Sequence, residues 1–226
     1  MGYYYPQQYR TQPRYDIKVE AYRQLGIALL LGTMTVAVMI YLNVPTALYW
    51  IGTIGEMLII GILFFAMLFR TQFSENTAAI LLYSFAICSS VSLSLIVYIG
   101  LFLEPAIVAG AVGTTTIVVL AAYLYSGSTI NKIGSLMKLA TVLVIFFLIF
   151  ALFGFFLFSS DPMFFFVFSL FGAIIFSIYI FIDFARLENR MFSSPSLMAL
   201  WLFYDIVYFL RQILIVLIYM FGGNRD

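Results

Sequence analysis

The stretch LWLFYDIVYFLRQILIVLIYMF, residues 200–221, is long and apolar enough to cross a lipid bilayer, yet it contains Asp205 and Arg211. A membrane-spanning helix needs about 20 predominantly apolar residues, and this stretch meets that requirement. A charged side chain near the centre of a bilayer costs about 2.5–3.5 kcal/mol on insertion scales. Two such side chains in one helix therefore indicate a helix bundle with a polar interior that has a function.

The composition of the whole chain also indicates an integral membrane protein. Of its 226 residues, 64% are hydrophobic and 9% are charged, whereas soluble domains are about 25% charged. The net charge of +1 argues against a nucleic-acid-binding protein. The chain has no histidine, so the usual general base and commonest metal ligand are missing. Proton chemistry must therefore rely on Asp, Glu, Lys, Tyr or Arg.

Seven apolar stretches are long enough to span a membrane, and short polar breaks separate them. The expected fold is therefore an all-α integral membrane protein, a bundle of seven transmembrane helices. The expected spans are residues 24–42, 47–69, 77–100, 105–125, 136–158, 162–191 and 196–221. We expect residues 24–221 to form a single membrane domain, flanked by a polar N-terminal tail (residues 1–23) and a short C-terminal tail (residues 222–226).

The basic residues indicate the orientation of the chain in the membrane. They occur before the first expected span and in the second, fourth and sixth connections, and are absent from the first, third and fifth connections. These residues are Arg10, Arg14, Lys18, Arg23, Arg70, Lys132, Arg186 and Arg190. Because positive charge accumulates in cytoplasmic loops, the pattern predicts a cytoplasmic N-terminus and a C-terminus outside.

Two aspartates inside the last two expected spans form the main candidate site. With the turn between these helices centred near Ser194, Asp183 and Asp205 each lie roughly 16 Å from the turn, so they face each other at one depth. Two carboxyl groups in one poorly solvated site cannot easily both carry a charge, and such a pair titrates as a unit. The pair therefore predicts a pH sensor that works without histidine.

The other ionisable groups within the spans leave several pairings open. Arg186 follows Asp183 by three residues and lies on the same helix face. Glu56 has no cation within two turns of its own helix, so it needs water or a partner from another helix, and it is a candidate for the wall of a pore. Arg211 is predicted to pair with Glu56 or with either aspartate, or to extend outward to the interface.

Two stretches near the end of the chain resemble the last two helices of the transmembrane Bax inhibitor motif family. They are GAIIFSIYIFIDFARL (residues 172–187) and SLMALWLFYDIVYFLRQIL (residues 196–214). The matching positions are Gly172, Phe176, Ser177, Tyr179, Asp183 and Asp205, whereas Phe203 stands where the family more often has leucine. Residues 54–65, 80–94 and 109–121 are similar to the family's second, third and fourth helices, so the resemblance covers about residues 20–221.

The resemblance implies a pH-sensitive calcium-leak channel that is not an enzyme and has no cofactor. It implies that Asp183 and Asp205 form the sensor, that Glu56 lines the ion path, and that these three acids bind calcium weakly and transiently.

The family has a latch arginine on its second helix. Arg70 is the nearest candidate here, but it lies about one helical turn further from Glu56 than expected. Arg186 and Arg211 are therefore alternative candidates for a latch or counter-charge.

The expected partners are calcium ions, protons and the lipid bilayer. The basic C-terminal tail of the family's eukaryotic members is missing, which favours a prokaryotic cell-membrane protein.

Two other functions remain as alternatives. A proton-coupled secondary transporter also uses buried carboxylates, but it usually shows inverted repeats or broken helices, and the sequence shows neither. An intramembrane aspartyl protease needs two membrane aspartates, and Tyr204-Asp205 matches half of its signature. Its second half, a Gly-x-Gly-Asp, is missing, since Phe181 and Ile182 precede Asp183.

Overall fold

The computed structural model of the chain describes residues 17–69, 73–129, 133–158, 161–189 and 194–222. Seven helices occupy these ranges, without any strand among them. The helices are α1 (Ile17–Tyr41), α2 (Thr46–Leu68), α3 (Glu75–Leu103), α4 (Pro105–Thr129), α5 (Ile133–Phe158), α6 (Pro162–Glu188) and α7 (Pro195–Gly222). The expected all-α bundle of seven helices is confirmed.

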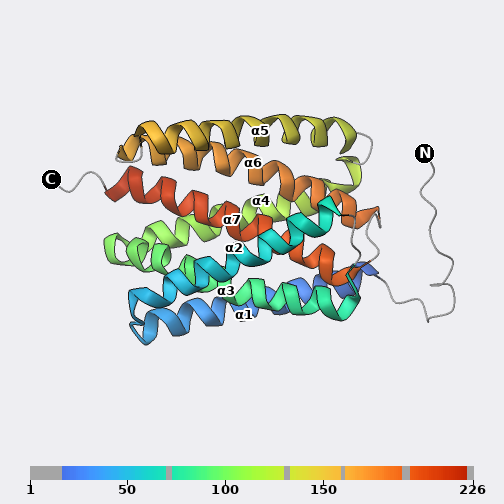
Figure 1. The fold of residues 1–226 in the computed structure, drawn as a ribbon, viewed down its shortest axis with the longest axis horizontal. Coiled ribbons are helices and arrows are strands. Elements are labelled where there is room, and N and C mark those ends of the chain that lie inside the picture. Colours follow the sequence, from blue (N-terminus) through green and yellow to red (C-terminus); the bar gives the residue numbers. More distant parts are fainter. Residues whose placement is uncertain (1–16, 70–72, 130–132, 159–160, 190–193, 223–226) are drawn as a thin grey trace.

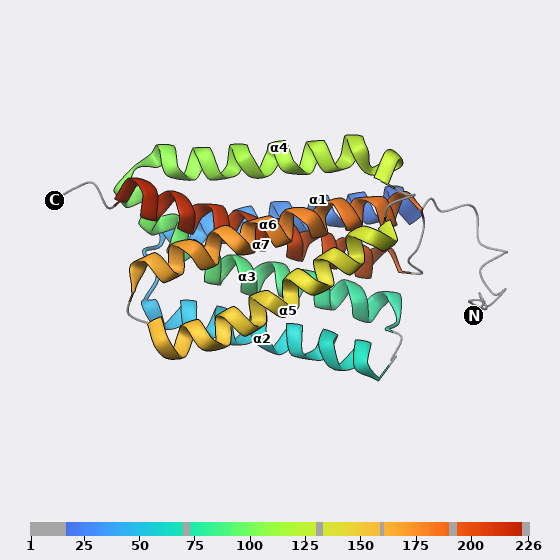
Figure 2. The same ribbon diagram turned by 90° about the horizontal axis from the view of Figure 1, so that it is seen from above.

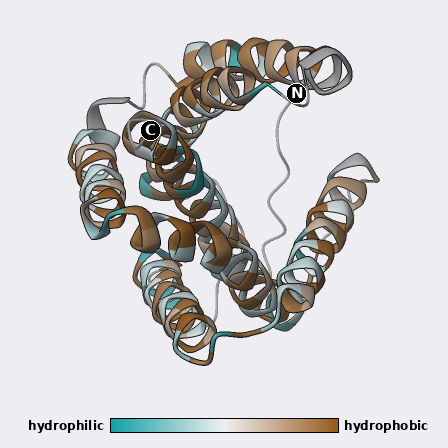
Figure 3. Cartoon of the chain, turned by 90° about the vertical axis from the view of Figure 1, so that its left-hand side faces the viewer, coloured by the Kyte–Doolittle hydropathy of each residue, from teal (hydrophilic) through white to brown (hydrophobic). Residues whose placement is uncertain are grey.

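The helices have the length and surface of membrane spans. Six of them are long and apolar enough to cross a bilayer, and α5 is apolar over residues 133–147. The 28 residues of α7 correspond to about 42 Å of helix, more than the roughly 30 Å of a hydrocarbon core. Large hydrophobic side chains are exposed along the helices, and hydrophobic residues, in brown, outnumber hydrophilic ones, in teal, when the bundle is viewed end-on (Figure 3). The chain is therefore an integral membrane protein.

Successive helices run in opposite directions along the bundle. The odd-numbered helices α1, α3, α5 and α7 begin at one end, which we call the N-terminal face, and α2, α4 and α6 begin at the opposite face (Figure 1). Ile17 and Gly222 consequently lie at opposite ends of the molecule.

Helix α7 lies in the middle of the bundle, where it packs against α1, α3, α4 and α6 (Figures 1 and 2). Helix α2 packs chiefly against α3, and α5 against α6. Half of the apolar segment of α7 is buried, a larger share than in the other long spans. This central position shields Asp205 and Arg211 from lipid, which explains how α7 accommodates both.

Helix α1 begins at Ile17, well before the expected start at residue 24. Its first two turns are polar, but they pair with other protein groups instead of ending the helix. Lys18 forms an ion pair of 2.6 Å with Glu188, and Arg23 forms one of 2.5 Å with Glu20. Hydropathy marks the apolar part of a helix, whereas backbone hydrogen bonding continues into the polar turns at the membrane surface.

Candidate functional site

Asp183 of α6 and Asp205 of α7 meet in the interior of the bundle. Only 2% of Asp183 and 4% of Asp205 is exposed, and their carboxyl groups lie close enough to interact directly. Two carboxyl groups can hydrogen-bond to each other only when one of them holds a proton, because an ionised carboxylate can only accept. The aspartates therefore lie together at one depth, where two carboxyl groups can share a proton.

One of the two aspartates also has a cationic partner. The Arg186 guanidinium donates to Oδ1 of Asp183 over 3.0 Å, from one turn further along α6. The same guanidinium also acts electrostatically on Asp205. Arg186 is thus the arginine that reaches the aspartate pair, while Arg70 lies outside the described residues and its proposed latch role stays a prediction.

Aromatic side chains lie next to the aspartate pair. Tyr204 precedes Asp205 on α7, and its ring lies 4.5 Å from that of Tyr208 and 5.7 Å from that of Phe85. Phe176 of α6 contacts both tyrosine rings, at 5.8 and 5.2 Å. These aromatic rings join α3, α6 and α7 at this level of the bundle.

A second charged pair joins α2 to α7. Glu56 is 1% exposed, and Nη2 of Arg211 donates to its Oε2 over 3.0 Å. The same Nη2 lies 3.2 Å from the Ser92 hydroxyl of α3, and the guanidinium lies over the Tyr208 ring, 4.7 Å from its centroid. Of the partners that the sequence left open for Arg211, the structure selects Glu56.

Two glycines of α2 explain why Glu56 reaches this position. A Cβ atom on Gly52 would lie 2.6 Å from a Val91 methyl carbon, and one on Gly55 would lie 2.7 Å from Sγ of Cys88. The absence of side chains at these positions lets α2 approach α3 closely. This approach brings Glu56, the residue after Gly55, into the interior where Ser92 and Arg211 meet.

Among the residues that the structure describes, three buried polar atoms at this level have no hydrogen-bond partner. They are Oε1 of Glu56, Nε of Arg211 and Oε1 of Gln212. Buried polar atoms are normally paired, so two acceptors and one donor remain available here. The Glu56–Arg211 pair therefore has unpaired polar atoms that can bind water or an ion.

The two acidic sites do not merge into one metal site. Asp205 and Arg211 are six residues apart on α7, which corresponds to about 9 Å along the helix. Among the residues that the structure describes, no three His, Cys, Asp or Glu side chains are close enough to hold a metal ion together. The expected weak calcium site formed by Glu56, Asp183 and Asp205 stays a prediction; in this conformation Glu56 is paired with Arg211 further along the bundle.

A third polar cluster, at the N-terminal face, was not expected from the sequence. Glu75 at the start of α3 accepts hydrogen bonds from Ser194 and Ser196 at the start of α7. Gln24 of α1 joins the same network. In the sequence these residues stand near the ends of apolar stretches, where polar side chains are ordinary, so composition gives no signal of their contact. Ser194 also caps α7, since its hydroxyl oxygen accepts from the Leu197 backbone N–H.

Comparison with known proteins gives one result for the whole chain. The model of the protein family described as Inhibitor of apoptosis-promoting Bax1 matches residues 18–224. This range includes all seven helices apart from the first residue of α1. No curated protein matches the sequence.

Proposed function

Because this chain belongs to the family Inhibitor of apoptosis-promoting Bax1, we propose that it is a pH-sensitive calcium-leak channel with Asp183 and Asp205 as its proton sensor. The observation that carries the proposal is the burial of these two interacting carboxyl groups together inside the bundle. Ionisable residues within membrane spans usually mark a relay, a pathway or a pair. A pair that must hold a proton to keep its contact is suited to sensing pH.

The proposed mechanism follows from the charge of the pair. With one shared proton, the hydrogen bond joins α6 to α7. Without it, two adjacent carboxylates repel each other, and Arg186, 3.0 Å from Asp183, offsets only part of that repulsion. Because α6 and α7 pack against each other along their lengths, a change in the charge of the pair alters the packing of both helices. The pH dependence of calcium flux into liposomes decides whether protonation of the pair opens or closes the channel.

Glu56 and Arg211 supply the proposed ion path. Glu56 offers a carboxylate oxygen without a partner, and calcium prefers such hard oxygen ligands. Arg211 is the counter-charge that neutralises Glu56 when no ion is present. A site that binds calcium weakly and transiently allows an ion to leave as well as to enter, which conduction requires.

We also propose that the N-terminal face lies in the cytoplasm of a prokaryotic cell. Four of the five described basic residues, Lys18, Arg23, Lys138 and Arg186, lie in the first turns of odd-numbered helices or the last turn of α6. Those turns are at the N-terminal face, where the positive-inside rule places the cytoplasm.

The proposal is tested by calcium flux into liposomes that contain the purified protein and a calcium-sensitive dye. Flux is measured at acidic, neutral and alkaline pH for the wild type, Asp183→Asn and Asp205→Asn. We expect flux that depends on pH in the wild type and loses most of that dependence in both variants. Asp161→Asn is the matched control, because Asp161 is exposed at the start of α6 and caps that helix.

Two outcomes would overturn parts of the proposal. Normal pH dependence in both aspartate variants would exclude the pair as the sensor. An absence of calcium flux at every pH would exclude the leak and favour the proton-coupled transporter, in which Asp183 and Asp205 would carry the proton. Proton uptake driven by candidate substrates would then be the next measurement.

A further inference from the structure

The polar cluster at the N-terminal face attaches the start of α7 to α3. The carboxylate of Glu75 accepts from the Ser194 hydroxyl over 2.6 Å and from the Ser196 backbone N–H over 3.0 Å. It also accepts from the Ser196 hydroxyl. Ser194 and Ser196 are buried, whereas Glu75 is exposed on its other side. One carboxylate therefore binds three donors from the first turn of another helix.

This arrangement places a negative charge at the N-termini of two helices. The first backbone N–H groups of a helix have no partner within it, and the helix dipole leaves a partial positive charge there. Glu75 is in the first turn of α3 and also binds a free N–H group of α7. Removing its charge would therefore weaken α7 at its start as well as break the contact between the helices.

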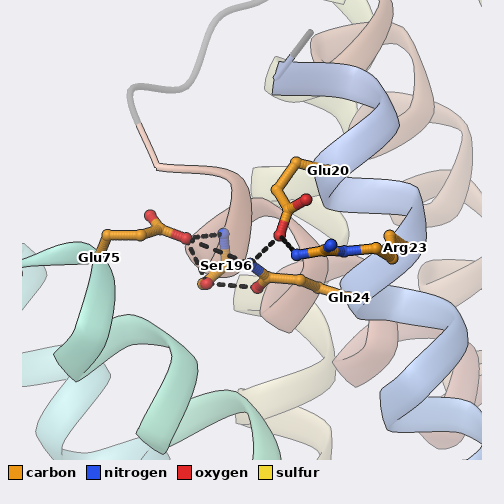
Figure 4. A network of polar contacts seen from close by, with 5 residues as sticks. All are labelled: Glu20, Arg23, Gln24, Glu75 and Ser196. Carbon is orange, nitrogen blue, oxygen red and sulfur yellow. Dashed lines mark hydrogen bonds and ion pairs between the residues drawn. The ribbon is translucent and has the colours of Figure 1, made fainter. Parts of the chain in front are cut away.

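Helix α1 completes the cluster through Gln24 (Figure 4). Nε2 of Gln24 donates to Oε1 of Glu20 over 2.9 Å and lies 3.4 Å from Oε1 of Glu75. The Ser196 hydroxyl also contacts Oε1 of Gln24, and Arg23 is paired with Glu20 at 2.5 Å. Three helices that are distant in sequence are thus joined around one side chain, that of Ser196.

The cluster is in a position to control the aspartate pair. Ser196 and Asp205 are on the same helix, nine residues or about 13.5 Å apart. Helix α7 is continuous between them, so a displacement of its first turn moves Asp205 relative to Asp183 on α6. The aspartates are deeply buried, whereas Glu75 is accessible from the aqueous side, so the attachment can be altered from solution.

We propose that Glu75 is a positioning residue for the aspartate pair, a latch that holds the start of α7 against α1 and α3. Release of this latch allows α7 to move and changes the pH response of the pair. The role of the latch in gating rests on the proposed channel function. The attachment itself does not, so the two are tested separately.

The attachment is tested by hydrogen exchange of the backbone amides in residues 194–200. We compare the wild type with Glu75→Ala, which removes all the acceptors, and Glu75→Gln, which keeps one carbonyl oxygen. Glu104→Ala is the control, because it removes the same charge from an exposed position at the other end of α3. We expect exchange in Glu75→Ala to be about fivefold faster, the change for about 1 kcal/mol of lost hydrogen bonding, with Glu75→Gln between it and the wild type. Equal exchange in Glu75→Ala and the wild type would overturn the attachment.

The role of the latch is tested by the pH profile of calcium flux in the same variants. We expect Glu75→Ala to raise flux about fivefold at the pH of least flux, with partial recovery in Glu75→Gln and none of this change in Glu104→Ala. Faster exchange together with an unchanged flux profile would exclude the positioning role. If the wild type shows no flux at all, the proposed channel function fails, while the exchange result still decides whether the attachment exists.

Discussion

Replacing Arg211 by Met should leave Glu56 as an uncompensated buried acid and destabilise the protein strongly. The variant removes the charge and the hydrogen-bond donors and leaves a shorter, unbranched apolar side chain. Glu56 then loses the Nη2 donor at 3.0 Å, while its other oxygen already has no partner. No other cation is paired with Glu56 among the described residues.

The size of the effect follows from the geometry of the pair. Two unit charges 3.0 Å apart attract each other by about 5.5 kcal/mol at an effective dielectric constant of about 20, and desolvation offsets part of this attraction. Removal of one partner from a buried pair typically costs about 3–5 kcal/mol. The contact of Arg211 with the Tyr208 ring at 4.7 Å adds roughly 1 kcal/mol that the variant also loses. We therefore expect a loss of about 4 kcal/mol in the free energy of unfolding.

The assay is a double-mutant cycle measured by unfolding in mixed detergent micelles. It compares the wild type, Arg211→Met, Glu56→Gln and the double variant. Because the double variant has no unpaired charge, we expect it to be more stable than the sum of the single effects predicts, by about 2–3 kcal/mol. Lys138→Met is the control, since Lys138 is exposed on α5. Additive effects, within about 0.5 kcal/mol, would refute the conclusion that this ion pair stabilises the bundle.

Three further predictions concern α6 and α7. Gly172→Ala should cost about 1–3 kcal/mol of unfolding free energy, because its Cβ would lie 2.9 Å from Cδ of Gln212; Gly113→Ala, which meets no atom within 4 Å, should cost nothing in the same assay. Arg186→Gln removes the positive charge 3.0 Å from Asp183, which favours the protonated pair, so the midpoint of the flux–pH curve should move to higher pH; an unchanged midpoint would show that Arg186 does not influence the sensor. Ser194→Ala removes the acceptor of Leu197 N at 3.1 Å and should lower the free energy of unfolding by about 1 kcal/mol, measured as a lower melting temperature. An unchanged melting temperature would exclude a capping role.

The sequence was sufficient for the fold because the signal for a membrane span is local. Each helix must carry its own run of apolar residues, since lipid cannot satisfy an exposed backbone. The seven expected spans therefore overlap the seven helices. The largest difference is at α1, where polar turns extend the helix to Ile17, whereas α4 runs four residues beyond its expected end and α6 ends three residues before it, at Glu188. The contact of Asp183 with Asp205 was also predictable, since two antiparallel helices joined by a short turn bring residues equally distant from that turn to one depth.

Contacts between helices that are distant in sequence depended on the tertiary structure. Hydropathy shows that Arg211 is inside a span, but its partner depends on which face of α7 meets α2 and α3. That packing is decided by the close approach at Gly52 and Gly55, which no local pattern reveals. Glu56 and Arg211 are 155 residues apart, and Glu75 and Ser196 are 121 apart. The sequence by itself thus determined the spans and the aspartate pair, whereas only the packing of α7 against α1 and α3, and of α2 against α3, decided which charges and hydrogen-bonding groups meet.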